Sequence, residues 1–289
     1  MSQKNIKNAL TELFSLIIDI GIWIFLIGFA IFVLVPVVFM FTASLMPARD
    51  IMSIPYPWIP RTLHLQNFWQ AIRGNDGRFL FSRSIINSLI VASLTTVGTV
   101  FLSALTGFGL AKYKFKGRNF VFLTILSTMM IPFEAIMIPL YLLVINIGWQ
   151  DTYTGLIVPL IASAFGIFVM RQFFITFPDE FIDHARIDGA NEFMIFWKIA
   201  LPNSKPAVAA LSVLTFRAQW DNLIWPLLII QSPEKKTIPL YISQFASEKY
   251  TNEGALMAAA VIASIPMIVI FLSFTKYFIT GAELFTGRK

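Results

Sequence analysis

The dominant pattern along this chain is a series of long apolar stretches separated by short polar links. Six stretches are long enough to cross the hydrocarbon of a bilayer, which takes about 20 apolar residues in a helix. They cover approximately residues 22–46, 85–111, 120 to beyond 132, 156–174, 206–230 and 255–279. The pattern predicts an all-α membrane protein with six transmembrane helices, and residues 1–21 form an N-terminal segment before the first of them.

Composition supports a membrane class and excludes an ordinary soluble domain. Charged residues make up 13% of the 289 residues and hydrophobic residues 57%, whereas a soluble domain usually carries about 25% charge. The formal charge is +6, but most Lys and Arg lie in the polar links, which indicates membrane topology and not nucleic-acid binding. The absence of cysteine excludes disulfides, thiol catalysis and cysteine-ligated metals.

The basic residues of the links predict the orientation. Short cytoplasmic links collect Lys and Arg, and the links after the second and fourth stretches carry Lys112, Lys114, Lys116 and Arg118, and Arg171, Arg186, Lys198 and Lys205. The link at residues 145–155 has neither residue. We therefore expect the second and fourth links and both termini in the cytoplasm, and the third link outside.

The charges at the two chain termini and in the first outer link also bear on this topology. The termini carry Lys4, Lys7, Lys276, Arg288 and Lys289, in agreement with a cytoplasmic location. The predicted outer link at residues 47–83 contains five arginines, which points the other way. Because this link is longer and also contains Asp50 and Asp76, it carries less weight in the prediction. The first stretch is too long for a signal peptide and is expected to be retained.

Local signals add detail to the second and third stretches. Thr99, Ser103, Gly107 and Ala111 recur every four residues, a spacing that lets two helix backbones approach closely, either within the chain or between subunits. In the third stretch, Pro132 and Pro139 lie on either side of Glu134. Proline kinks or ends a helix, so we expect a break there, followed by a short helix on the outer side.

The link at residues 177–207 is long and organised. Asp179 is placed to cap a first helix over residues 180–188, and Gly189 can take the left-handed conformation that ends it. Asn191 can cap a second helix, which starts with Glu192 and is limited by Pro202. In the first helix, Phe181, Ile182 and Ala185 would form an apolar side, and Asp183 is spaced to pair with Arg186. Such a pair of helices can dock into a groove of a soluble partner or lie on lipid.

The residues of this link resemble a known family. D-H-A-R-I-D-G-A at residues 183–190, followed by I-A-L-P at 199–202, is similar to the EAA loop of binding-protein-dependent ABC transporter permeases. The common form in the carbohydrate branch is E-A-A-R-I-D-G-A, so Asp183 replaces Glu and His184 replaces Ala. The motif matches the residues Asp183, His184, Ala185, Arg186, Asp188, Gly189 and Ala190, and the resemblance implies that they contact the ATPase.

The resemblance extends over nearly the whole chain. INSLIVA at 86–92, IPFEAIMIPLY at 131–141, RQFF at 171–174, QWDNLIWPL at 219–227 and KYFITGA at 276–282 are similar to motifs of the carbohydrate branch, above all to the second permease of maltose-type systems. The resemblance implies an importer transmembrane domain over residues 22–289, with a core at about 80–280, in the cell inner membrane. It also implies a sister permease, two ATP-binding subunits that hold ATP and Mg²⁺, and an extracytoplasmic binding protein that delivers a sugar.

Several polar residues and one tryptophan within the stretches are candidates for the substrate pathway, because charge inside a membrane is costly and often functional. These candidates are Glu134, Arg217, Trp220, Asp221 and Asn222. Arg217 and Asp221 are spaced to neutralise each other, which is an equally good structural explanation. Trp220 and Trp225 are suited to stack on a sugar, although aromatic residues in spans more often serve packing.

The alternatives differ in cargo and in class. A permease of the same class for a glycerol phosphate, polyol or other non-sugar solute fits the same motifs. An ion-coupled secondary transporter would show paired inverted repeats and an ion site of mid-membrane carboxylates, and no such repeat is present in the sequence. No P-loop for ATP occurs, since GFGLAK at 107–112 lies in an apolar stretch. With no catalytic cluster either, the chain itself is not expected to be an enzyme.

Overall fold

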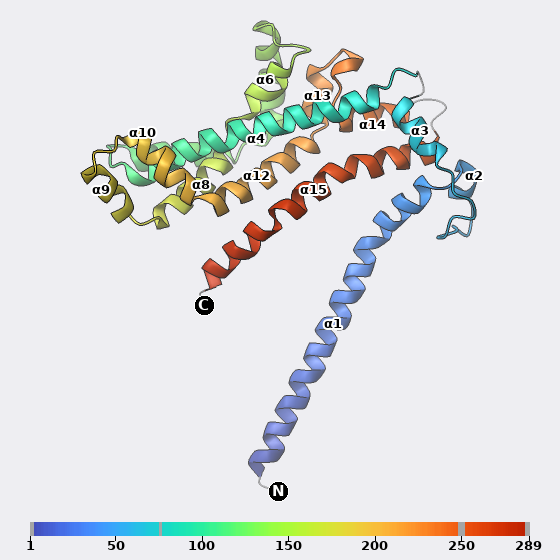
Figure 1. Cartoon of the computed structure of the whole chain (residues 1–289), viewed down its shortest axis with the longest axis horizontal. Coiled ribbons are helices and arrows are strands. Elements are labelled where there is room, and N and C mark those ends of the chain that lie inside the picture. The colour runs from blue at the N-terminus through green and yellow to red at the C-terminus, as the bar shows by residue number, and fades with distance from the viewer. Residues whose placement is uncertain (1–2, 75–76, 248–251, 287–289) are drawn as a thin grey trace. The chain divides into compact units, whose positions relative to one another are not determined.

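The computed structural model describes residues 3–74, 77–247 and 252–286, and every regular element in those ranges is a helix (Figure 1). Contacts divide the chain into two compact units. One contains residues 1–71 and 250–261, and the other contains residues 72–249 and 262–289. The helical class predicted from the apolar stretches is confirmed.

The first unit is dominated by α1 (Gln3–Ser44), which includes most of the segment predicted to precede the first span. No residue of the most apolar window within Leu13–Ser44 is buried, as expected for a helix that faces lipid, although Ala43 and Ser44 at the end of α1 are buried. Asn67 in α3 (Gln66–Arg73) secures the end of α1, because its amide donates hydrogen bonds to the carbonyls of Ser44 at 3.0 Å and Met46 at 2.7 Å. The short helix α2 (Ala48–Ile51) lies between them in the sequence.

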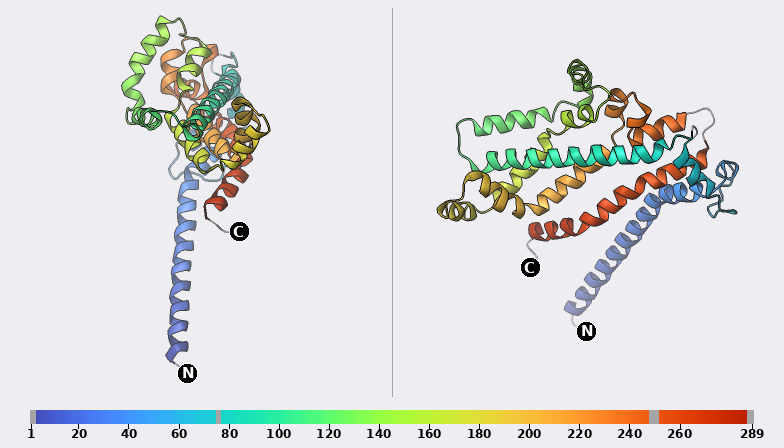
Figure 2. Two further views of the ribbon diagram at one scale, coloured as in Figure 1. Left: turned by 90° about the vertical axis from the view of Figure 1, so that its left-hand side faces the viewer. Right: turned by 45° about the horizontal axis from the view of Figure 1, so that its top comes forward.

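The second unit is built on α4 (Leu80–Lys112), which packs against α8 (Ala164–Thr176) and α12 (Lys205–Trp220) (Figure 2). The small residues predicted to form a packing face make these contacts close. A Cβ atom added at Gly107 would lie 2.8 Å from the backbone nitrogen of Arg171. A Cβ added at Gly166 of α8 would lie 2.3 Å from the hydroxyl of Ser103. This face therefore packs within the chain, which was one of the two alternatives.

The predicted break in the third stretch is confirmed, and a further break occurs in the fourth. α5 (Arg118–Thr128) and α6 (Phe133–Asn146) meet at 94°, with Pro132 at the start of α6. The pair formed by α7 with the following 3-10 turn η1 (Tyr153–Ile157 and Val158–Leu160) meets α8 at 46°. The second break was not predicted, and Ser163 stabilises it by accepting a hydrogen bond from Gly166 N at 3.0 Å.

The described residues contain three to five candidate spans, which is fewer than the six predicted. Among the described residues, α1, α4 and α15 (Glu253–Thr286) are long and apolar enough to cross a membrane, and counting each bent pair as one span gives up to five. The predicted fifth span divides into α12 and the short α13 (Ile224–Ile229), separated by residues 221–223. Neither piece is long enough alone, so the count of six stays a prediction.

A polar cluster near the N-terminal end of α4 connects this helix to η3 (Pro233–Lys235), α14 (Ile238–Ser247) and α7. Asn87 donates to the carbonyls of Glu234 and Lys236, both at 2.9 Å, and accepts from the Tyr153 hydroxyl at 2.7 Å. Ser88 accepts from Ile238 N at 2.8 Å. These bonds place the turn η3 and the start of α14 against α4.

Asp151 joins the same region from the link between α6 and α7. It accepts hydrogen bonds from Gln231 N at 3.1 Å, from Ser232 N at 3.1 Å and from the Ser232 hydroxyl, and it pairs with Lys235 at 3.1 Å. Burial alone would raise the pKa of this carboxyl, but the hydrogen bonds from Ser232, Gln231 and Lys235 outweigh burial and hold the pKa at about 2. Asp151 is therefore ionised and fixed at neutral pH.

Candidate functional site

The organised link folds as two short helices around a glycine turn. α9 (Glu180–Ile187) ends at Asp188, and Gly189 has a φ of +82°, a conformation that glycine adopts without strain. The Asn191 side chain accepts a hydrogen bond from Met194 N at 2.8 Å and caps α10 (Glu192–Ile195). The predicted helix–glycine–helix arrangement and its Asn191 cap are confirmed. We call residues 180–195 the knob.

The second helix extends through a π-helical turn. η2 (Phe196–Ala200) and α11 (Leu201–Asn203) follow α10 directly, and the helical run ends at Asn203, one residue past Pro202. In the π-helical turn, Leu201 N donates to the carbonyl of Phe196. The predicted limit of the second helix at Pro202 is therefore correct to within one residue, whereas the π-helical turn was not predicted.

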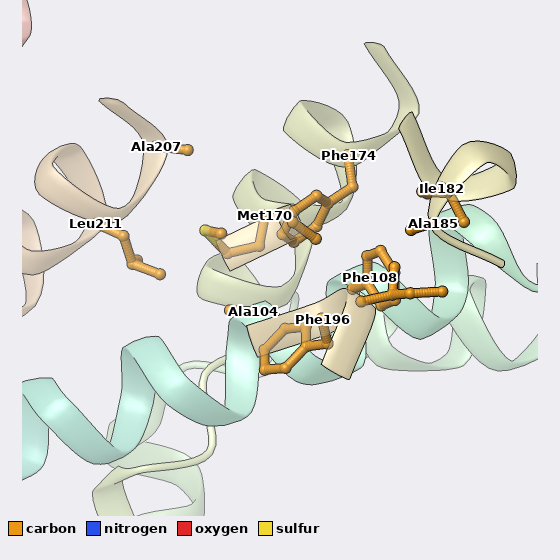
Figure 3. Close-up of a cluster of buried hydrophobic side chains, with 11 residues drawn as sticks. Ala104, Phe108, Met170, Phe174, Ile182, Ala185, Phe196, Ala207 and Leu211 are labelled. Carbon is orange, nitrogen blue, oxygen red and sulfur yellow. The ribbon is translucent and has the colours of Figure 1, made fainter. Parts of the chain in front are cut away.

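The underside of the knob is buried against the scaffold of the second unit. Ile182 and Ala185 of α9 and Phe196 of η2 belong to one buried apolar cluster with residues of α4, α8 and α12 (Figure 3). Phe108 of α4 is central, since its ring lies 5.4 Å from that of Phe174 and 5.6 Å from that of Phe196. The packing of these rings makes the knob part of a rigid body with three long helices.

The predicted apolar side of α9 is only partly buried. Ile182 and Ala185 are buried, whereas Phe181 is 57% exposed. Phe181 contacts Phe177 at the edge of the cluster, with the ring centroids 5.7 Å apart. Phe181 lies one turn before Ala185 on the same side of the helix, so it forms the exposed edge of the predicted apolar side.

Charged residues brace the knob from within. Arg186 donates to Glu192 at 2.8 and 3.3 Å and to Asp183 at 3.1 Å, which confirms the predicted pairing of Asp183 with Arg186. The hydrogen bonds from Arg186 and then from Tyr113 lower the pKa of Glu192. The two helices on either side of Gly189 are thus connected by Arg186 and Glu192.

The end of α4 holds both helices of the knob. The Tyr113 hydroxyl donates to Glu192 Oε2 at 2.6 Å, and burial together with this bond raises the pKa of Tyr113 to about 12. The ammonium group of Lys112 contacts Asp179 at 2.6 Å and the carbonyl of Phe177, and its side chain is only 6% exposed. The hydrogen bond and charge of Lys112 lower the pKa of Asp179.

The position of Asp179 corrects the sequence prediction. Its side chain makes no capping hydrogen bond to α9, because the carboxylate is directed to Lys112 instead. Asp179 is therefore part of the attachment to α4. Sequence spacing cannot reveal this contact, since the two residues are 67 positions apart.

The outer surface of the knob remains accessible. The motif residues His184, Asp188 and Gly189 are exposed, as is Asp183. Ile187 is 81% exposed at the end of α9, an unusual position for a large apolar side chain in water. The knob therefore presents a mixed apolar and charged tip on a firmly packed base, which is the geometry of an element that docks into a groove of another protein.

Comparison with known proteins shows the family of the chain. The family model described as the inner membrane component of binding-protein-dependent transport systems matches residues 99–282, which include the knob, α8, α12 and the second part of α4. The chain belongs to this family. It is a transport permease of the ABC importer class, a multi-pass protein of the inner membrane, and its family is not one of enzymes.

Relatives cover almost the whole permease. It is 35% identical over 264 residues to the arabinooligosaccharides transport system permease protein AraQ of Bacillus subtilis, covering 91% of this chain and 93% of the relative. It is 34% identical to the sn-glycerol-3-phosphate transport system permease protein UgpE of Yersinia enterocolitica, covering 91% and 95%. A crystal structure of a bacterial ABC transporter for the acidic polysaccharide alginate shares the fold, with a TM-score of 0.82 at 24% identity, covering 91% of the permease and 96% of that chain.

The pathway candidates of the permease lie apart from the knob. Arg217 and Asp221 are both exposed and form an ion pair at 3.5 Å, which confirms that they can neutralise each other. Asn222 accepts a hydrogen bond from Trp225 N at 3.3 Å. Glu134 is exposed in the first turn of α6, close to the 94° bend.

The two tryptophans considered for sugar stacking are used in packing. Trp220 is buried and stacks on Phe216, with the centroids 5.8 Å apart. Trp225 is fully buried, and its indole nitrogen donates to the carbonyl of Gly155 at 3.1 Å. Both positions agree with the structural alternative, and contact of either ring with substrate stays a prediction.

Sequence reasoning missed three residues that hold the knob in place, namely Lys112, Tyr113 and Glu192 in its bracing role. Lys112 served only as evidence of membrane topology, and no role was predicted for Tyr113. The sequence does contain a signal for the structural role of Lys112. Lys112 directly follows an apolar run, where a cation is placed to reach the carbonyls and carboxylates of a neighbouring link.

Proposed function

We propose that this permease forms half of the translocation pore of an importer for a sugar or oligosaccharide, and that its knob docks into a separate ATP-binding subunit. The observation that carries the proposal is the braced knob, whose tip is exposed while its base is tied to α4 by Tyr113 and Lys112. ATP and Mg²⁺ are held by two partner subunits. A sister permease supplies the other half of the pore.

The brace suggests how movement of the ATPase reaches the pore. When the two ATP-binding subunits close on ATP, the groove that holds the knob moves, and the tip moves with it. Because the buried cluster around Phe108 joins the knob to α4, α8 and α12, these helices move with the knob. The pore would then switch between inward-facing and outward-facing states, and an extracytoplasmic binding protein would deliver the solute to the outward-facing one.

The relatives support two classes of cargo. AraQ is named for arabinooligosaccharides, which favours a neutral oligosaccharide for this permease as well. UgpE is named for sn-glycerol-3-phosphate, so a small phosphorylated solute is the second candidate. Both candidates carry hydroxyl groups but differ in charge, and direct comparison of the two can therefore separate them.

Reconstitution tests the proposal. The permease is co-expressed with the sister permease, ATP-binding subunits and binding protein encoded nearby, and ATP hydrolysis is measured with the binding protein loaded with neutral oligosaccharides, polyols or sn-glycerol-3-phosphate. Stimulation by an oligosaccharide supports the main proposal, and stimulation only by glycerol phosphate supports the second cargo. Solute uptake by vesicles containing this chain alone, without ATP, would contradict both.

Topology is tested separately. We propose that both termini and the knob face the cytoplasm, which agrees with the basic links. The chain contains no cysteine, so a single cysteine near either terminus or at Ile187 is the only site for a membrane-impermeant thiol reagent. Protection in intact cells and labelling after permeabilisation are expected at all three positions. Labelling of Ile187→Cys in intact cells would place the knob outside and remove the basis of the coupling proposal.

A further inference from the structure

The first unit contains an apolar surface that the coupling function does not use. The segment that follows α1 exposes large apolar side chains, including Ile54 at 98% and Ile59 at 83%. Met52, Trp58, Leu63 and Leu65 in the same segment are also exposed. Soluble surfaces rarely present so many large apolar residues together, and such a patch usually marks contact with a protein or a membrane.

This segment is attached to the C-terminal end of α1. The Tyr56 hydroxyl lies 2.7 Å from the hydroxyl of Thr42, and its ring lies 4.8 Å from that of Phe39. Trp58 packs edge-on against Tyr56 at 5.2 Å, and His64 N donates to the carbonyl of Leu45 at 2.8 Å. The exposed residues are therefore held close to the last turns of α1.

The length of the apolar run shows the depth at which these turns lie. Asp19 is the last charged residue before the run, and Phe39 follows 20 positions later. At about 1.5 Å per residue, that distance is about 30 Å, the thickness of the hydrocarbon layer. With Asp19 near one edge of the hydrocarbon, Phe39 and Thr42 lie at the other, so the segment attached to them lies at the membrane–water interface.

We propose that residues 52–65 insert their apolar side chains into the outer leaflet of the bilayer and anchor the first span there. The segment contacts α1 through Tyr56, and no residue of the most apolar window of α1 is buried. Trp and Tyr prefer the interface because their rings are apolar and their polar atoms remain hydrated. The partner is therefore lipid, whereas a binding protein or sister permease would need a different explanation for the position beside the span.

The arginines of this region fit the same arrangement. Arg49 precedes the apolar residues and Arg61 lies between Ile59 and Leu63; both arginines are exposed, and Arg49 also pairs with Asp50 at 3.5 Å. Long cationic side chains beside an inserted segment can reach lipid phosphates while their stems remain among apolar groups. Contact with phosphate gives these two arginines a role on the outer side, where the bias of Lys and Arg toward cytoplasmic links does not predict them.

Spin labelling tests the anchor in the assembled transporter. Nitroxides are attached to single cysteines at Ile54, Ile59 and Leu63, and the transporter is reconstituted in vesicles of phosphatidylethanolamine and phosphatidylglycerol. Collision rates are measured with oxygen, which concentrates in lipid, and with a water-soluble nickel chelate. Phe32→Cys in the middle of α1 is the lipid reference, and Gln231→Cys in an exposed polar turn is the water reference. The oxygen-to-nickel ratio at the three test sites is expected to be closer to that of Phe32.

The other outcomes overturn the proposal. A ratio equal to that at Gln231 would mean that the segment lies in water. Low access to both reagents would mean that another subunit covers it. Loss of access only after the loaded binding protein is added would assign the surface to that protein. The use of three test sites keeps the result interpretable if one variant does not assemble.

Discussion

The Tyr113 hydroxyl and the Glu192 carboxylate are 2.6 Å apart, although 79 positions separate them in the chain. Tyr113 directly follows α4, and Glu192 begins α10, so this bond connects the main scaffold helix with the second helix of the knob. Glu192 also binds Arg186 of the first helix. The Glu192 carboxylate thus makes hydrogen bonds that connect both helices of the knob to the end of α4.

Tyr113→Phe removes only the hydroxyl and tests this link. The aromatic contact with Phe108, at 5.8 Å, is retained, so the fold and the amount of permease in the membrane should stay unchanged. We expect the same recovery of ATP-binding subunits but less solute transported per ATP hydrolysed, because the knob can move relative to α4. Tyr141→Phe, the same change at a residue packed against the separate apolar cluster that contains Trp225, is the control. An unchanged transport-to-hydrolysis ratio in Tyr113→Phe would contradict a coupling role for the bond.

The pair of Arg186 and Glu192 allows a charge-exchange test. Arg186→Glu places three carboxylates together, and Glu192→Arg places two guanidinium groups together, so each single change should lower stimulated ATP hydrolysis. Like charges at this distance repel, and the exchange restores attraction. The double variant should therefore recover part of the lost hydrolysis, though not all, because Asp183 and Tyr113 keep their original chemistry. Equal activity of the double variant and the worse single variant would show that the pair does not act as a unit.

Gly189 separates a backbone effect from a steric one. A Cβ at this position would have nothing within 4 Å, and the φ of +82° is the only obstacle to a side chain. An ordinary residue in the left-handed conformation costs roughly 1–2 kcal/mol, whereas Asn tolerates it better. We expect ATPase recovery on purification to fall in the order Gly, Asn, Ala, Val at position 189, with the native protein and all three variants reaching the membrane. Recovery with Gly189→Val equal to the native level would show that docking does not need this turn.

The lowered pKa of Asp151 predicts how the stability of the permease depends on pH. Its folded pKa of about 2 is lower than the ordinary value of about 3.9, so its contribution is complete above pH 5 and is lost as the pH falls toward 2. Asp151→Asn should lower the stability of the purified permease at pH 7 by at most about 2 kcal/mol, and the difference in Tm should shrink below pH 4. Asp188→Asn, at an exposed position, is the control. A constant Tm difference between pH 7 and 3 would show that the charge of Asp151 is not responsible.

The sequence by itself determined the features that depend on neighbouring residues. The apolar runs determine a helical membrane protein, because a helix satisfies its own backbone in lipid. Pro132 determines the break before α6, and Gly189 and Asn191 determine the turn of the knob, because each acts through its own backbone or the next few residues. The similarity of residues 183–190 to the EAA loop indicates the family without any tertiary contact.

Only the tertiary structure decided which side chains meet across the chain. It directs Asp179 to Lys112 instead of to its own helix, buries Trp220 and Trp225, and joins Tyr113 to Glu192. Each of these contacts links residues or elements that are distant in sequence, and no periodicity records them. The physical reason is that the rigidity of the knob comes from packing and hydrogen bonds between separate helices, whereas the pattern of one helix specifies only that helix.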